Sequence, residues 1–192
     1  MAAAKYEFAE YGLSGARVDA IASRAKANKR MIYHYFVSKD HLFQAVLEEA
    51  YLEIRTAEQA LDLDQFSPEE AMEKLVRFTW TYYLDNPEFI SLINSANLHR
   101  ARHLAGSERI RIASRQLVET MQKIVDRGVQ TGSFRSGVDV VQLSITIAAI
   151  GYYYLTNRYT GSIIYERDFM DPDVLDTRID FNIDTVMRHL AA

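Results

Sequence analysis

Cysteine is absent from this chain of 192 residues. The absence excludes a disulfide framework, a thiolate metal site and a cysteine nucleophile, and it suits a reducing compartment. The first residues, Met1 to Glu7, also lack the apolar core of a secretory signal peptide. The most apolar stretch, Ile145 to Leu155, is far shorter than the roughly 20 residues that span a bilayer. We therefore expect a cytoplasmic protein with no membrane partner.

Proline and glycine are scarce, with three and eight residues respectively, which argues against a fold of many turns. Each proline follows a residue that favours the N-cap of a helix, in Ser67-Pro68, Asn86-Pro87 and Asp171-Pro172. Proline is tolerated at the first helical position because its missing N–H would have no partner there. Ser67 and Glu70 also match a capping box. The three prolines therefore predict three helix starts.

Apolar residues recur at helical spacing along most of the chain. One segment is ambiguous, because residues 141–147 alternate with a period of two, as in a β-strand. No second strand is available to pair with it, so a helix is the better interpretation. The sequence predicts an all-α fold with helices at residues 3–11, 18–25, 29–36, a long segment from 39, 68–84, 87–104, 108–131, 139–159 and 172–190.

Charge is unevenly distributed along the chain. The formal net charge of −4 argues against a uniformly basic nucleic-acid-binding protein. Residues 17–41, however, hold six Lys and Arg against two Asp, a local net charge of +4. Residues 42–192 hold 15 basic and 22 acidic side chains, a net charge of −7. A basic segment on an acidic body can attract phosphate locally.

This basic segment contains the pattern of a helix-turn-helix motif. Two short predicted helices, 18–25 and 29–36, are joined by Lys26-Ala27-Asn28 and preceded by a first short helix. The second helix is expected to expose its polar residues and to pack its apolar face inward through Met31, Ile32, Tyr35 and Phe36. On residues alone, these charges and aromatic rings could equally belong to the solvated surface of a small bundle.

The sequence resembles the TetR family of bacterial transcriptional repressors over about its first 50 residues. The matching segments are FAEYG (8–12), VDAIA (18–22), NKRMIYHYF (28–36) and SKDHL (38–42). A weaker likeness to one subgroup continues in NLHR (97–100) and NRYT (157–160). The resemblance implies a helix-turn-helix DNA-binding domain at residues 1–47 and a helical ligand-binding and dimerisation domain at 48–192.

The resemblance also implies which side chains contact DNA. These are Arg17, Lys26, Lys29, Arg30, Tyr33, His34 and Lys39. Two positions depart from the family pattern. Lys26 stands where a small residue, often glycine, is usual, and there it either adds a phosphate contact or strains the turn. Arg17 stands where Ser or Thr commonly caps the second helix.

The C-terminal part contains many aromatic and amide side chains on predicted helices. Rings with a few amides are typical of a small-molecule cavity, although each residue could also belong to an ordinary core. The resemblance implies an inducer pocket in this region. Its candidate residues are Trp80, Tyr83, Phe89, Asn94, Asn97, His99, Tyr152, Tyr153 and Asn157.

His99 and His103 are the only candidate metal pair, because i,i+4 histidines share one face of a helix. Nearby arginines oppose a bound cation, and no catalytic motif is present elsewhere. We therefore expect no metal, no cofactor and no enzymatic activity. A helical metal-dependent enzyme or binding protein that uses His99 and His103 is the alternative.

The predicted helix at 139–159 is apolar on most sides and needs a packing partner. With the helix at 172–190 it could form half of an intermolecular four-helix bundle, as the resemblance implies, or it could be buried in a monomer. The expected function is that of a homodimeric repressor that binds a near-palindromic operator and is released by a small-molecule inducer. An activator or architectural factor with the same DNA-binding motif remains open.

Overall fold

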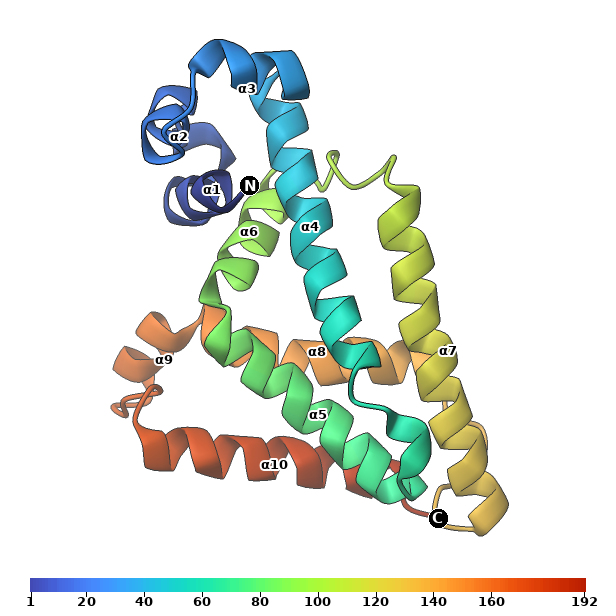
Figure 1. Ribbon diagram of the computed structural model, residues 1–192. Helices are drawn as coiled ribbons and strands as arrows, with labels where there is room; N and C mark the ends of the chain where they lie inside the picture. Colours follow the sequence, from blue (N-terminus) through green and yellow to red (C-terminus); the bar gives the residue numbers. More distant parts are fainter. The chain divides into compact units, whose positions relative to one another are not determined.

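A computed structural model describes all residues from Met1 to Ala192 (Figure 1). It confirms the all-α fold, because no β-strand is present and only an isolated bridge joins Phe134 to Ala191. The elements are α1 (Ala2–Gly15), α2 (Val18–Arg24), α3 (Lys29–Phe36), α4 (Lys39–Gln59), a short 3₁₀ turn (Leu63–Gln65), α5 (Pro68–Asp85), α6 (Pro87–Leu98), α7 (Glu108–Thr131), α8 (Val140–Thr156), α9 (Arg158–Ile164) and α10 (Pro172–Leu190).

All three prolines begin helices as predicted, and Ser67 and Asp171 cap theirs through their side chains, whereas Asn86 makes no side-chain cap hydrogen bond. The hydroxyl of Ser67 accepts from the backbone N–H of Glu70 at 3.3 Å, and Glu70 accepts from Ser67 in return. Asp171 accepts from the backbone N–H of Asp173 at 2.9 Å at the start of α10. The segment 141–147 lies within α8, so its interpretation as a helix is confirmed.

Two predicted helices were too long. Helix α6 ends at Leu98 rather than near residue 104, because Arg100 and Ala101 adopt left-handed backbone angles that a right-handed helix cannot contain. Helix α8 ends at Thr156, where Asn157 turns its amide back onto the Tyr153 carbonyl at 2.8 Å. The chain then begins the separate helix α9, which the sequence patterns did not predict.

The first of two compact units contains residues 1–54 and 86–113. In it, α1 packs against both α2 and α6. Its core includes Phe8 and Phe43, whose rings meet edge to face with centroids 5.0 Å apart. Helix α1 bends at Gly12, which has a φ of 65° and therefore a conformation that favours glycine.

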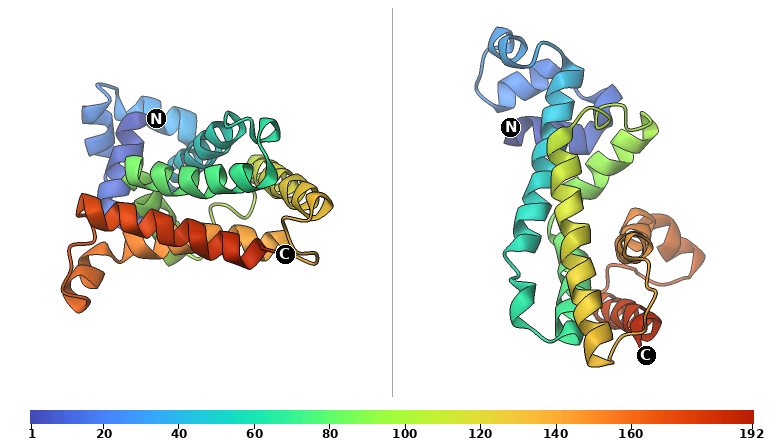
Figure 2. Two further views of the ribbon diagram at one scale, coloured as in Figure 1. Left: turned by 90° about the horizontal axis from the view of Figure 1, so that it is seen from below. Right: turned by 90° about the vertical axis from the view of Figure 1, so that its right-hand side faces the viewer.

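The second unit contains residues 55–85 and 114–192. Helix α5 packs against α8 and α10, and α8 also contacts α10 (Figure 2). Arg127 on α7 closes the irregular segment before α5, because its guanidinium donates to the carbonyls of Leu63, Asp64 and Phe66. The largest fully buried side chains of this unit are Met72, Leu75, Met121, Ile124, Val186 and Leu190.

These units differ from the division at residues 47 and 48. Residues 48–54 group with the N-terminal helices because α4 continues without interruption past residue 47, and residues 86–113 join them because α6 packs on α1. No helix is long and apolar enough to cross a membrane.

Candidate functional site

Helix α3 exposes much of its surface to solvent, and none of its residues is fully buried. Met31 and Tyr35 were expected to pack inward, and this expectation was wrong: their exposed fractions are 48% and 69%. Only Ile32 and Phe36 are half-buried. In a helix of two turns, the stripe 32/36 meets the rest of the unit, while the neighbouring stripe 31/35 lies about 100° away and faces outward.

The turn between α2 and α3 contains one of the two departures from the family pattern, Lys26. Lys26 has a φ of 51°, the left-handed conformation that favours glycine. Its backbone N–H donates to the Ser23 carbonyl at 3.1 Å, and the Ala27 N–H donates to the Ala22 carbonyl at 3.0 Å. The tight turn is therefore kept at the expense of backbone strain, while the side chain of Lys26 remains exposed.

The start of α3 is capped by Asn28. Its side-chain oxygen accepts from the backbone N–H of Arg30 at 2.8 Å. Lys29 lies with its Nζ 2.8 Å from Asp19 on α2, and the hydrogen bond to Asp19 raises the pKa of Lys29. Arg30 forms no ion pair and is exposed. The start of α3 therefore presents one paired and one unpaired cation.

Aromatic rings continue this surface toward the end of α3. Tyr33 and His34 are both exposed, and the ring of His34 meets that of Tyr35 edge to face with centroids 5.4 Å apart. The surface offers hydrogen-bond donors from Arg30, Tyr33 and His34 beside apolar atoms from Met31 and Tyr35. Such a mixture suits the edges of bases in a major groove, where thymine methyl groups alternate with polar atoms. Met31 and Tyr35 both fit helical apolar spacing, and for this reason the sequence predicts them in the core.

Lys39 and Arg17 have different environments. The Nζ of Lys39 donates to the Ala16 carbonyl at 3.1 Å, so its charge already satisfies the end of α1. Arg17 has an exposed side chain, and its backbone N–H donates to the buried carboxylate of Glu7 at 3.2 Å. The Glu7 carboxylate therefore accepts a hydrogen bond from one backbone N–H at the start of α2, where the sequence lacks a capping Ser or Thr.

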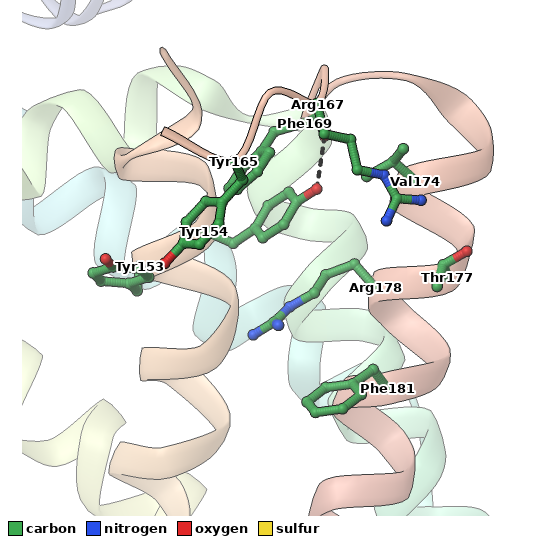
Figure 3. Close-up of a pocket in the computed structure, with 9 residues that line it drawn as sticks. All are labelled: Tyr153, Tyr154, Tyr165, Arg167, Phe169, Val174, Thr177, Arg178 and Phe181. Atoms are coloured by element: carbon green, nitrogen blue, oxygen red, sulfur yellow. Dashed lines mark hydrogen bonds between the residues drawn. The ribbon is translucent and has the colours of Figure 1, made fainter. Parts of the chain in front are cut away.

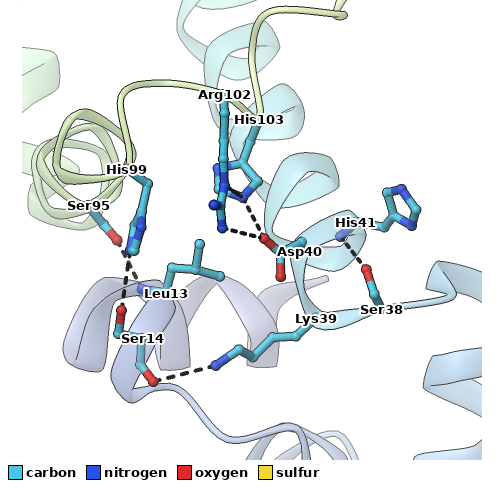
Figure 4. A network of polar contacts seen from close by, with 10 residues as sticks. All are labelled: Leu13, Ser14, Ser38, Lys39, Asp40, His41, Ser95, His99, Arg102 and His103. Carbon is cyan, nitrogen blue, oxygen red and sulfur yellow. Dashed lines mark hydrogen bonds and ion pairs between the residues drawn. The ribbon is translucent and has the colours of Figure 1, made fainter.

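A polar network surrounds the first turn of α4 (Figure 4). Asp40 accepts from Nε2 of buried His103 at 2.9 Å and from Arg102 at 2.9 Å. The hydrogen bond from His103, assisted by Arg102, lowers the pKa of Asp40. Nearby, Nε2 of His99 lies 3.3 Å from the hydroxyl of Ser14.

The expectation that His99 and His103 share a helix face is corrected by this geometry, since both follow the end of α6. Their ring centroids are 6.2 Å apart, but each ring has a protein partner. No group of three His, Asp or Glu side chains in the chain is arranged to hold a metal ion.

The predicted pocket residues are divided between the two units. Phe89, Asn94, Asn97 and His99 belong to the first unit. The other five, Trp80, Tyr83, Tyr152, Tyr153 and Asn157, belong to the second unit. Trp80 and Tyr83 are buried in its core, where both rings lie against Gly151.

A cavity of about 530 Å³ lies in the second unit, between α8, α10 and the segment that joins α9 to α10 (Figure 3). Of the predicted pocket residues, only Tyr153 lines it. Sequence reasoning missed the others because Arg167 and Arg178 resemble ordinary surface charges, and α9 with its following segment was not recognised. The lining residues are Tyr153, Tyr154, Tyr165, Arg167, Phe169, Val174, Thr177, Arg178 and Phe181.

Known proteins share both parts of this chain. Residues 1–46 match the family model described as "Bacterial regulatory proteins, tetR family", and residues 68–186 match "Tetracyclin repressor-like, C-terminal domain". The chain is 36% identical over 183 residues to the HTH-type transcriptional repressor NicS of Pseudomonas putida, covering 95% of this chain and 86% of NicS.

Solved structures show the same fold. SCO4942 from Streptomyces coelicolor has a TM-score of 0.73 at 21% identity, covering 98% of this chain and 94% of its own. The regulator FadR from Bacillus subtilis, in complex with stearoyl-CoA, has a TM-score of 0.70 at 15% identity, covering 98% and 96%. The resemblance inferred from the N-terminal motifs is thus confirmed along almost the whole length, and the chain belongs to the TetR family of bacterial transcriptional regulators.

Proposed function

We propose that this protein is a transcriptional repressor that binds a near-palindromic operator as a homodimer and is released by a small molecule. The observation that carries the proposal is helix α3, which has no buried residue and lies in a segment of net charge +4. Most side chains of this helix contribute little to the core, so they are available to contact DNA. Membership of the TetR family supports the same function.

The proposed DNA interface divides into two kinds of contact. Arg30, Tyr33 and His34 on α3 reach base edges in the major groove, joined by Met31 and Tyr35, which the structure exposes. Phosphate contacts come from residues at the rim of α3: Arg17, Lys26 and Lys29. Lys39 has a mixed role, because its bond to Ala16 orients the start of α4, whose N-terminal N–H groups face phosphate.

The proposed dimer forms through α8 and α10. Val141, Ile145 and Tyr153 recur at multiples of four on α8 and are exposed, and Phe181 on α10 is exposed as well. A contiguous stripe of large apolar side chains indicates a protein contact surface. A twofold dimer on a near-palindromic operator needs its two α3 helices one DNA turn apart, about 34–36 Å.

The proposed effector acts by favouring a dimer conformation in which the two α3 helices are wrongly spaced. A ligand that reverses a 99:1 equilibrium needs about 5.5 kcal/mol of differential affinity between the two conformations. The cavity between α8 and α10 supports such control, because it lies on the two helices proposed to form the dimer.

The test begins with selection of binding duplexes from a random library, followed by gel shift and a reporter assay. Arg30→Ala is expected to weaken specific binding by about 1–3 kcal/mol and to relax sequence preference at one position. Arg115→Ala on α7 is the matched control, since Arg115 is exposed in the second unit. Failure to enrich any duplex, or equal losses in the two variants, would contradict the proposal. Increased rather than reduced reporter transcription would identify an activator.

A further inference from the structure

The cavity between α8 and α10 has one wall of parallel rings. Tyr154 and Phe169 stack with centroids 4.4 Å apart and an interplanar angle of 12°, and Tyr165 lies 5.9 Å from Phe169 at 17°. The hydroxyl of Tyr154 donates to the Phe169 carbonyl at 3.0 Å. Gly161 on α9 leaves the space that the Phe169 ring occupies, since a Cβ there would overlap it. The wall is therefore held in place before any ligand arrives.

A cation without a carboxylate partner faces these rings. Arg178 on α10 points into the cavity in Figure 3, with its guanidinium carbon 5.3 Å from the Tyr154 ring centroid and 5.4 Å from that of Phe181. One guanidinium nitrogen donates to the Ile150 carbonyl at 3.3 Å, while Nε is buried and has no partner. The side chain as a whole is half-buried. No ion pair joins its guanidinium to a carboxylate, so its charge can still take an anionic partner.

The rest of the lining keeps this positive character. Arg167 is a second cation in the wall, and no acidic residue is among the lining residues. Asp168, which follows Arg167 in the sequence, accepts from the backbone N–H of Met170 at 2.9 Å and so serves the local turn. The cavity therefore attracts a negative group, and Arg178 can offer a planar fork of donors to it.

The aromatic lining of the cavity favours one kind of organic anion. Five of the nine lining side chains are aromatic, and Val174 is the only aliphatic one. Flat rings stack favourably on flat rings, whereas an alkyl chain prefers an aliphatic channel. A volume of about 530 Å³ lies within the range of pockets for small organic molecules and leaves room for more than one ring.

We propose that this cavity binds a planar aromatic carboxylate, with the carboxylate on Arg178 and the ring system against the wall of Tyr154, Phe169 and Tyr165. The assignment of this ligand as the effector rests on the proposed function of the protein. The binding itself does not.

Binding is tested by isothermal titration of the intact protein without DNA, using benzoate and 1-naphthoate as probes and their uncharged amides as controls. Both acids are expected to bind, with naphthoate the tighter because it covers more of the aromatic wall. Each amide is expected to bind roughly tenfold more weakly than its acid, since it loses the charge-assisted bonds to the guanidinium. No measurable binding of either acid, or equal binding of acid and amide, would overturn the proposal.

Substitutions at Arg178 test whether this residue binds the carboxylate of the ligand. Arg178→Met should abolish the preference for acid over amide, and Arg178→Lys should restore part of it by returning the charge without the fork. Arg188→Met is the control on the same helix, because Arg188 is exposed and paired with Asp184. If Arg178→Met fails to fold, the Lys variant and the acid–amide comparison on the unaltered protein decide. Equal effects of changing Arg178 and Arg188 would contradict the assignment.

A separate gel shift on the selected duplex distinguishes the two proposals. Acid binding with no duplex binding would contradict the repressor function and leave the assignment of the cavity intact. Duplex binding with no acid binding would contradict the cavity assignment alone.

Discussion

The carboxylate of Glu58 lies 2.9 Å from a guanidinium nitrogen of Arg55, yet its pKa is raised to about 7. Burial in the second unit is the larger influence, and the nearby charge of Arg55 only partly offsets it. The pair joins Arg55 Nη1 to Glu58 Oε2 without hydrogen-bond alignment, since Oε2 is buried with no hydrogen-bond partner. Proximity to an opposite charge therefore does not guarantee that a buried carboxyl ionises easily.

This relationship predicts a pH-dependent stability. Between about pH 4.5 and 7 the folded protein keeps a proton on Glu58 that the unfolded chain releases, so stability falls as pH rises through this window. Glu58→Gln should remove up to about 3 kcal/mol of this pH-dependent loss in the free energy of unfolding. Urea unfolding at pH 5 and pH 8 measures the difference in that free energy. Glu73→Gln, on an exposed carboxylate paired with Arg77, should leave the pH dependence unchanged, and the same result for Glu58→Gln would refute the prediction.

The strained turn before α3 predicts that two substitutions at one position differ in their effect on stability. Lys26→Gly should stabilise the protein by about 1 kcal/mol, because glycine adopts a left-handed φ without strain. Lys26→Ala keeps the strain and should not stabilise. Both variants lose the charge, so both should reduce the salt dependence of DNA binding by about one unit if Lys26 contacts phosphate. Thermal unfolding and salt titrations separate the two effects.

The close approach of α7 to the chain that follows it predicts a sensitive glycine. A Cβ at Gly128 would overlap the buried ring of Phe134, so Gly128→Ala should cost about 1–3 kcal/mol through overpacking. Gly106→Ala is the control, since nothing lies within 4 Å of a Cβ there. Denaturant midpoints compare the two. A smaller loss at Gly128 than at Gly106 would show that Phe134 moves away freely.

The exposed stripe of α8 predicts the effect of a charge on assembly. Ile145, with an exposed fraction of 55%, should tolerate glutamate in the isolated chain but not in an apolar interface between two copies. Ile145→Glu is therefore expected to give a folded monomer by light scattering and circular dichroism. Gln142→Glu places the same charge at an exposed polar position. An unchanged mass for Ile145→Glu would contradict a dimer through this stripe.

Much of the architecture was predictable because its causes are local. Pro68, Pro87 and Pro172 begin helices, and Asn28 caps α3, through interactions within a few residues. The end of α6 was not predictable, since nothing in the apolar pattern marks the left-handed residues Arg100 and Ala101.

The binding surfaces depend on contacts distant in sequence, so the sequence predicted them less completely. Tyr35 has the spacing of a core residue but finds no neighbour to cover it. Arg178 has the spacing of a surface charge, but its surroundings come from α8 and from residues 165–169, and only the fold brings these together. The sequence motif identifies Lys39, but only the structure shows that its Nζ donates to the Ala16 carbonyl.

Adjacent residues at the start of α4 are attached to different parts of the first unit. Lys39 holds the Ala16 carbonyl, and Asp40 holds His103 and Arg102. One peptide link therefore joins the segment after α6 to the chain entering α2. A displacement of residues 102–103 that preserves their bonds to Asp40 would therefore act on the residue next to Lys39, whose Nζ contacts the chain entering α2.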